Sequence, residues 1–206
     1  MLEPLRAFFT KVISPIATLL IRLGVSPDAV TLVGTLGVCA GALVFFPQGK
    51  LLTGVLVITA FVFSDLIDGH MARTTGRVSP FGAFWDSTLD RVADGAIFIG
   101  LALYFAWEEP NRLYLVLSLV CLLMGAVTSY ARSRGETLGF DVKVGIAERA
   151  DRLVAILVAA GLSEIFDLPV LLYIGLWALA IASTITVGQR VWVVRKQAMA
   201  QARTTI

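Results

Sequence analysis

Four aspartates with helical spacing lie in one polar stretch of an otherwise apolar chain. Asp65 and Asp68 are three residues apart, so both fall on one face of a helix. Asp86 and Asp90 are four apart and share a face in the same way. A turn rich in Gly, Ser and Pro separates the two segments and would let the two acidic faces meet. Because four crowded carboxylates repel each other, the pattern favours one or two divalent cations, and hard oxygen ligands select Mg²⁺, Mn²⁺ or Ca²⁺.

A pair of such cations about 4 Å apart would hold a phosphoryl group during displacement. Arg73 lies two turns beyond Asp65 and has the chemistry to bind a phosphate oxygen, and Gly69 leaves room for a ligand near the backbone. The sequence has no Ser–His or Cys–His pattern typical of a covalent nucleophile. We therefore expect direct in-line attack by an acceptor. Solvated loop carboxylates paired with arginines are the simpler interpretation, and we expect only packing or ion-pair roles for His70 and Asp94.

The composition places the chain in a membrane. Of its 206 residues 57% are hydrophobic and 16% charged, with a mean hydropathy of +0.83. Soluble domains carry roughly a quarter charged residues. This excludes a disulfide scaffold and a disordered tail, and a net charge of +2 without a long basic run argues against nucleic acid as a partner. Cys39 and Cys121 lie in apolar runs, where core positions are more common than a disulfide or a metal pair.

We predict an all-α integral membrane protein that forms a single domain over residues 1–206. Six transmembrane helices are expected within a 28–194 bundle, near residues 28–47, 51–73, 88–107, 111–133, 150–166 and 168–194. Apolar residues at spacings of three and four predict an amphipathic interfacial helix over 2–24, although a cleaved signal peptide is an alternative. Residues 195–206 would form a cytoplasmic tail.

The basic residues predict the orientation. All but two of the 17 Lys and Arg residues fall at the termini or in the second and fourth connections; the exceptions are Lys50 and Arg112. Because basic residues gather on the cytoplasmic side, both termini and the aspartate segment should face the cytoplasm of a plasma-membrane protein with an even number of spans.

The gapped pattern Asp65-x2-Asp68-Gly69-x2-Ala72-Arg73-x8-Gly82-x3-Asp86-x3-Asp90 resembles the signature of the CDP-alcohol phosphotransferase family at every fixed position. The resemblance implies a transferase that moves a phosphatidyl or related group from a CDP-linked donor to an alcohol and releases CMP. It also implies two metal ions, Mg²⁺ with Mn²⁺ as the alternative. The implied ligands are Asp65, Asp68, Asp86 and Asp90, with Asp90 also as the catalytic base.

The expected donor is CDP-diacylglycerol, whose acyl chains would lie in the bilayer. Ser26-Pro27-Asp28-Ala29-Val30-Thr31 opens the first span with strong capping residues, and capping alone is the simpler role. The family resemblance instead implies a donor-binding set, namely Asp28, Ala29, Val30, Thr31, Gly69, Arg73 and Ser79.

The acceptor is predicted from basic residues near the last two spans. The connection over 132–152 carries five of them, which favours a phosphorylated acceptor or reflects membrane topology alone. Ser129-Tyr130, Glu148-Arg149 and Gln189-Arg190 resemble an actinobacterial branch of the family. That resemblance implies inositol phosphate as acceptor, phosphatidylinositol phosphate as product, and a homodimer. The implied acceptor-phosphate ligands are Ser129, Arg132, Arg152 and Arg190.

The sequence is also compatible with two other functions. Phosphatidylglycerophosphate synthesis is the nearest, because glycerol phosphate is also an anionic acceptor. Metal or ion transport is a remote alternative, since membrane-embedded carboxylates also mark transporters. The acids at one end of the spans and the lack of internal repeats argue against transport.

Overall fold

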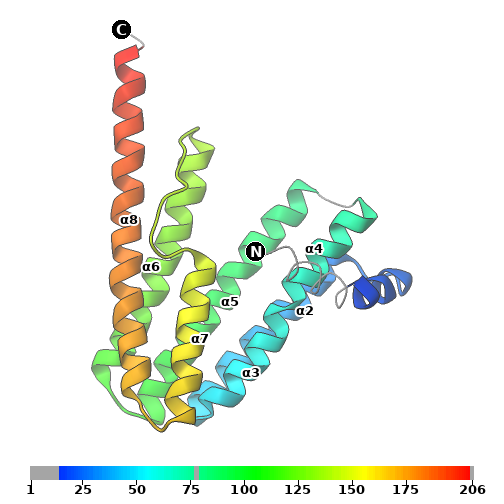
Figure 1. Cartoon of the computed structure of the whole chain (residues 1–206), viewed down its shortest axis with the longest axis vertical. Coiled ribbons are helices and arrows are strands. Elements are labelled where there is room, and N and C mark those ends of the chain that lie inside the picture. Colours follow the sequence, from blue (N-terminus) through cyan, green and yellow to red (C-terminus); the bar gives the residue numbers. More distant parts are fainter. Residues whose placement is uncertain (1–13, 77–78, 205–206) are drawn as a thin grey trace, which may run out of the picture.

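The computed structural model describes residues 14–76 and 79–204, and of Asp65, Arg203 and Thr204 it describes the main chain only (Figure 1). Within these residues every regular element is a helix, as predicted. Residues 14–22 are helical, whereas the first half of the expected amphipathic helix lies outside the described residues.

Each predicted span coincides with helical structure. α2 (Pro27–Ala40) continues through a π-helical turn (Gly41–Phe45) and a 3-10 turn (Phe46–Gln48), and the helices that follow are α3 (Leu51–Val62), α4 (Ser64–Thr75), α5 (Pro80–Trp107), α6 (Arg112–Thr137), α7 (Arg149–Ile165) and α8 (Val170–Thr204). The predicted second span is thus two helices that meet at Phe63. α8 runs on past 194, so the expected tail is a continuation of this helix as far as Thr204.

In the part of the chain that the structure describes, four helical stretches are long and apolar enough to cross a bilayer, and the chain is a membrane protein. They are Pro27–Gln48, Leu51–Thr75, Arg112–Thr137 and Val170–Ala202. α5 and α7 fall short of the same standard within the described residues. α5 carries Asp90, Arg91 and Asp94 close to its midpoint, and α7 is 17 residues long.

Glycines on α2 set how closely α3 and α4 approach it. A Cβ atom added at Gly34 would lie 1.9 Å from the Ser64 hydroxyl, and one added at Gly37 would lie 2.2 Å from the Phe61 ring. Because no side chain fits there, the joint between α3 and α4 packs directly on the α2 backbone. This contact places the first residue of α4 against the middle of α2.

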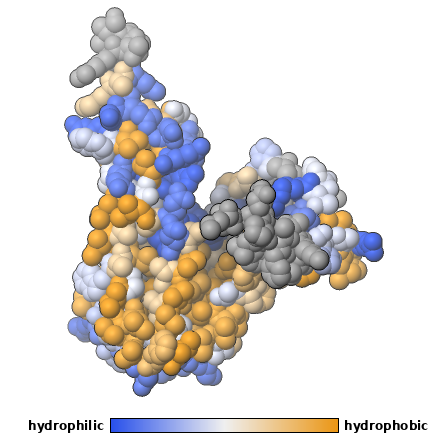
Figure 2. All heavy atoms as spheres, viewed as in Figure 1, coloured by the Kyte–Doolittle hydropathy of each residue, from blue (hydrophilic) through white to orange (hydrophobic). Residues whose placement is uncertain are grey.

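The helices converge at one end and splay at the other (Figure 1). Phe46, Ile58, Leu101, Phe105 and Leu176 are almost fully buried in the core. Apolar side chains dominate the surface of the converging half in the view of Figure 2, and polar residues gather toward the splayed end. The splayed end therefore offers polar groups a place beside, rather than within, the apolar part of the bundle.

Candidate active site

An open cleft of about 500 Å³ lies between α2, α4, α5 and the start of α7. Its lining brings together eight of the predicted site residues, namely Asp28, Thr31, Asp68, Gly69, Arg73, Ser79, Asp86 and Asp90. Ala29 and Val30, from the same segment as Asp28, do not belong to this lining. Asp65 is the second residue of α4, one turn before Asp68, and its side chain is outside the description.

Helix caps fix where two of the helices that line the cleft begin. The Ser26 hydroxyl accepts a hydrogen bond from Ala29 N at 3.2 Å and starts α2. The Ser79 hydroxyl accepts one from Gly82 N at 2.9 Å and starts α5. These serines satisfy N–H groups that a helix start leaves open. The caps place Asp28 and the first turn of α5 at the same rim.

Asp68 is the buried carboxylate of the cleft. Its side chain is 7% exposed, and its Oδ2 accepts a hydrogen bond from Thr31 Oγ1 at 2.5 Å. A hydroxyl bonded to a carboxylate makes a short, strong contact. Thr31, which the sequence placed in the donor-binding segment, therefore orients a predicted metal ligand.

The carboxylates of α5 are more open. Asp86 is exposed, whereas Asp90 is half-buried and paired with two arginines. Arg149 Nη2 lies 2.9 Å from Asp90 Oδ1, and Arg91 Nη2 lies 3.5 Å from Asp90 Oδ2. The described side chains, without Asp65, do not on their own bring three acidic, His or Cys groups into one ligand set.

Trp85 is a cleft-side contact that the sequence analysis did not identify. Its indole Nε1 donates a hydrogen bond to the Asp28 carbonyl at 3.2 Å and so ties α5 to the start of α2. The ring also stacks on Phe81, with centroids 6.0 Å apart. The available signal was a Trp directly before Asp86, because the indole of Trp carries an N–H group that needs a hydrogen-bond partner when it packs.

The predicted acceptor residues gather around one turn of α6. Ser129 lies on that turn, where its hydroxyl donates to the Gly125 carbonyl at 3.1 Å. Arg190 reaches it from α8, and its Nη1 donates to the Thr128 carbonyl at 2.6 Å. Arg152 reaches it from α7, with Nε 3.7 Å from where a Cβ at Gly125 would lie. The structure therefore brings Ser129, Arg152 and Arg190 together.

Both of these arginines are also bonded to the connection before α7. Arg190 Nε donates to the Val144 carbonyl at 2.9 Å, and Arg152 Nη1 donates to the Ala147 carbonyl at 3.3 Å. Each side chain is 3% exposed. Main-chain anchoring is therefore one role of these arginines, and none of the predicted acceptor residues lines the 500 Å³ cleft.

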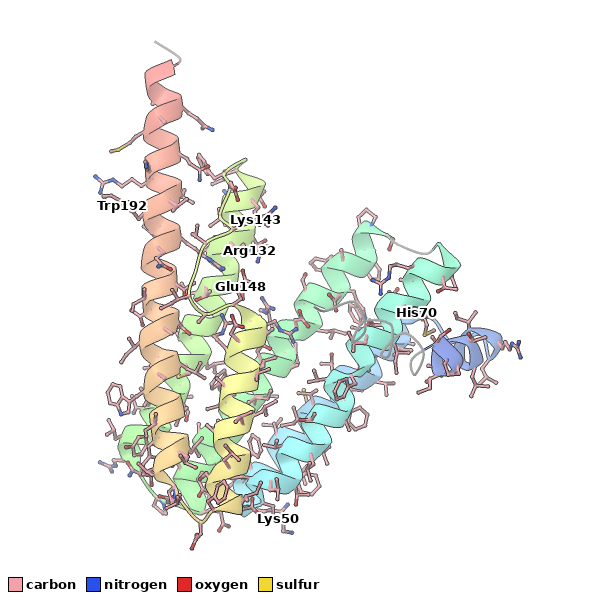
Figure 3. All side chains as sticks on the ribbon, viewed as in Figure 1. Lys50, His70, Arg132, Lys143, Glu148 and Trp192 are labelled. Atoms are coloured by element: carbon pink, nitrogen blue, oxygen red, sulfur yellow. The ribbon has the colours of Figure 1, made fainter. Side chains whose placement is uncertain are left out.

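Arg132 differs from the other predicted acceptor residues because it lies nearer the surface. It pairs with Glu136 at 3.0 Å and approaches Glu148 at 3.9 Å. Figure 3 shows Arg132, Lys143 and Glu148 on α6 and the α6–α7 connection at the splayed end, whereas Lys50 lies at the converging end. This separation agrees with the charge asymmetry on which the predicted orientation depends.

Asp94 has the arginine partners that were expected for it. Asp94 forms ion pairs with Arg149 and Arg91 at 3.0 and 3.8 Å. His70 lies on α4 but is not part of the cleft lining (Figure 3).

Residues 24–188 match the family described as CDP-alcohol phosphatidyltransferase. The match covers most of the chain, and the fold and cleft agree with it. The chain belongs to the CDP-alcohol phosphatidyltransferase family.

Individual relatives narrow the comparison. The chain is 56% identical to a phosphatidylinositol phosphate synthase of Streptomyces avermitilis, over 93% of this chain and 81% of the relative. A crystal structure of the Mycobacterium tuberculosis phosphatidylinositol phosphate synthase with CDP-DAG bound is 42% identical, with a TM-score of 0.85 over 89% of this chain and 94% of that one. The same mycobacterial enzyme in complex with manganese and citrate gives 43% identity and a TM-score of 0.84, over 88% of both chains.

Proposed function

We propose that the chain transfers the phosphatidyl group of CDP-diacylglycerol to inositol phosphate, forming phosphatidylinositol phosphate and releasing CMP. One observation carries the proposal. Three of the predicted carboxylates, Asp68, Asp86 and Asp90, line a single cleft together with residues of the predicted donor segment, although these segments are distant in sequence. The similarity to phosphatidylinositol phosphate synthases supports inositol phosphate as the acceptor.

The carboxylate set fits divalent metal ions. Asp68, Asp86 and Asp90 supply only hard oxygen donors to the cleft, and Asp65 lies one turn from Asp68. The guanidinium group of Arg149, itself a cation, sits against Asp90. Two bound Mg²⁺ ions, with Mn²⁺ as the alternative, would neutralise charge on the diphosphate of the donor and on the departing CMP. The complex of the mycobacterial enzyme with manganese supports a divalent metal at this site.

The chain's own residues would then position the reactants. Thr31 holds Asp68 in place, and Asp28, Gly69, Arg73 and Ser79, with the neighbouring main chain of Ala29 and Val30, would bind the CDP group.

The acceptor hydroxyl oxygen attacks the phosphorus that carries diacylglycerol, and the bond from this phosphorus to the CMP oxygen breaks. The hydroxyl proton passes to Asp90, which acts as the general base.

The acceptor would bind beside this cleft at the turn of α6 that carries Ser129. Arg152 and Arg190 converge there, and Arg132 lies about one turn further along α6. Guanidinium groups suit a phosphate because they offer paired N–H donors. Glycerol phosphate would meet the same donors, so phosphatidylglycerophosphate synthesis is the competing outcome of the test below.

We further propose that six helices cross the plasma membrane, with both termini and the cleft on the cytoplasmic side. The short α7 and the longer α5 would then each span the membrane. The charged first half of α5 would lie at the interface. Residues 2–24 would lie along the membrane surface as an amphipathic helix. A homodimer is proposed on the family resemblance.

An acceptor panel tests the proposed function. The purified chain is given CDP-diacylglycerol and Mg²⁺ with inositol phosphate, free inositol, glycerol 3-phosphate or serine, and both CMP and the lipid product are measured. We expect rapid CMP release with inositol phosphate and a lipid that carries the additional phosphate. A faster reaction with glycerol phosphate would assign the competing synthesis, and a lack of metal-dependent CMP release with every acceptor would refute the proposal.

A further inference from the structure

Two aspartates and two arginines form a connected group of ion pairs beside the cleft. Asp90 and Asp94 are one turn apart on α5, Arg91 lies beside them, and Arg149 is the first residue of α7. We call these four residues the α5–α7 ion quartet. The two negative and two positive formal charges of the quartet cancel.

Arg149 contacts the two aspartates through different nitrogens. Its Nη2 lies 2.9 Å from Asp90 Oδ1, and its Nε lies 3.0 Å from Asp94 Oδ1. It can therefore leave one aspartate without leaving the other. Arg149 also lines the cleft, whereas Asp94 does not.

Asp90 lines the cleft and has a guanidinium group near each of its oxygens. Arg149 Nη2 faces Oδ1, and Arg91 Nη2 is 3.5 Å from Oδ2. A metal ion that binds Asp90 therefore competes with these guanidinium groups for the carboxylate. Moving an arginine away from Asp90 costs less if the arginine keeps another anionic partner. Without one, its charge would be left uncompensated in a half-buried site.

We propose that Arg149 is a positioning residue that competes with the divalent metal for Asp90, and that Asp94 is the anchor to which it withdraws. This inference rests on the proposed function. Without the metal, Arg149 bridges both aspartates. When Asp90 turns to the metal, Asp94 keeps the guanidinium group at the side of the cleft, where it still balances the charge of α5.

The proposal predicts opposite changes in metal affinity for two removals. Arg149→Gln removes the competitor and should tighten Mn²⁺ binding roughly three- to tenfold. Asp94→Asn removes the anchor while Arg149 keeps its contact with Asp90, so Mn²⁺ binding should weaken by a similar factor. A residue that only supported the fold would not give tighter binding when removed.

The deciding variant combines both changes. In Asp94→Asn/Arg149→Gln the anchor has nothing to hold, so the Mn²⁺ affinity should equal that of Arg149→Gln alone. If Asp94→Asn weakens binding by the same factor with and without Arg149, Asp94 acts as a nearby negative charge and the proposal is wrong. An unchanged or weaker affinity in Arg149→Gln also overturns it.

The measurement is a Mn²⁺ titration of the purified full chain in detergent, with free Mn²⁺ read by its electron paramagnetic resonance signal. Arg149→Lys keeps the charge but cannot bridge through two nitrogens, so binding should tighten; wild-type affinity would contradict the bridging role. Arg134→Gln, at an exposed position on α6, is the matched control and should leave the affinity unchanged.

Asp68→Asn separates this inference from the proposed function. Its failure to weaken Mn²⁺ binding would refute the metal site of the proposed function itself. A clear loss in Asp68→Asn, together with unchanged affinity in the Arg149 variants, would refute only the competition.

Discussion

The two halves of the candidate site are built differently. In the donor half, around α4 and the first part of α5, Asp68, Arg73 and Asp86 line an open cleft. In the acceptor half, Arg152 and Arg190 are 3% exposed and donate hydrogen bonds to main-chain carbonyls. Residues in the first half are held by helix spacing and caps, whereas those in the second half also hold a connection in place. Substitutions of the cleft carboxylates should therefore affect chemistry alone, whereas substitutions in the acceptor half should affect both chemistry and structure.

The largest effect is expected from the carboxylates of the donor half. Asp68→Asn and Asp86→Asn should each abolish CMP release, because each removes a charged oxygen ligand from the proposed metal site. The helix content of both variants should be preserved, as measured by circular dichroism. Asp167→Asn is a matched control at the opposite end, where a positive φ suits Asn as well as Asp. Near-normal turnover in either cleft variant would contradict the metal site.

Asp90→Asn should lower turnover less than the two preceding variants and should leave donor binding intact. An amide cannot accept the acceptor proton, and general base catalysis is typically worth about 10²–10⁴-fold. Turnover should fall by that factor while CDP-diacylglycerol still binds, as measured by a direct binding titration. If metal analysis finds Mn²⁺ lost as completely as in Asp68→Asn, Asp90 is chiefly a ligand rather than the base.

The acceptor half should respond through KM. Arg152→Gln and Arg190→Gln should each raise the acceptor KM about ten- to a hundredfold, since a hydrogen bond to a charged group contributes about 1.5–3 kcal/mol. The donor KM should change little. Lys at either position should restore only part of the affinity, because it lacks the planar fork.

Thermal unfolding should separate Arg190 from the donor half. Arg190→Gln removes two main-chain hydrogen bonds that join α8 to α6 and to the connection before α7, so its Tm should fall more than that of Asp86→Asn. An unchanged acceptor KM together with a lower Tm would make Arg190 a structural residue only.

The smallest effect compares two serines with the same local role. Ser26→Ala and Ser79→Ala each remove a helix N-cap and should each lower stability by about 0.5–2 kcal/mol. Only Ser79 lines the cleft, so only Ser79→Ala should also raise the donor KM, about two- to tenfold. Equal donor KM values in the two variants would leave Ser79 a cap without contact to the donor.

The sequence predicted most of the residues that line the cleft, because the information that places them is local. Asp65 and Asp68, and likewise Asp86 and Asp90, are related by helical spacing alone, and caps at Ser26 and Ser79 mark where helices begin. The positions of the helices were also readable from hydrophobic length, although α8 continued beyond the apolar stretch because nothing in its last turns breaks a helix.

The acceptor half could be predicted only in part. Ser129, Arg152 and Arg190 come from three helices, and their meeting depends on how α6, α7 and α8 pack. Composition cannot distinguish an arginine that binds a substrate from one that holds a loop, and we propose both uses for Arg152 and Arg190. The contact of Trp85 with the Asp28 carbonyl and the bridge of Arg149 between two aspartates were equally out of reach, because each joins segments that are more than 50 residues apart.

The proposed use of a phosphorylated acceptor is tested most directly by one ratio. The value of kcat/KM for inositol phosphate is divided by that for free inositol, first in the wild type and then in Arg152→Gln. We predict a ratio well above ten in the wild type, because the phosphate group contributes at least one charged hydrogen bond worth about 1.5–3 kcal/mol, and a marked fall in the variant. Equal use of free inositol by the wild type would contradict the account.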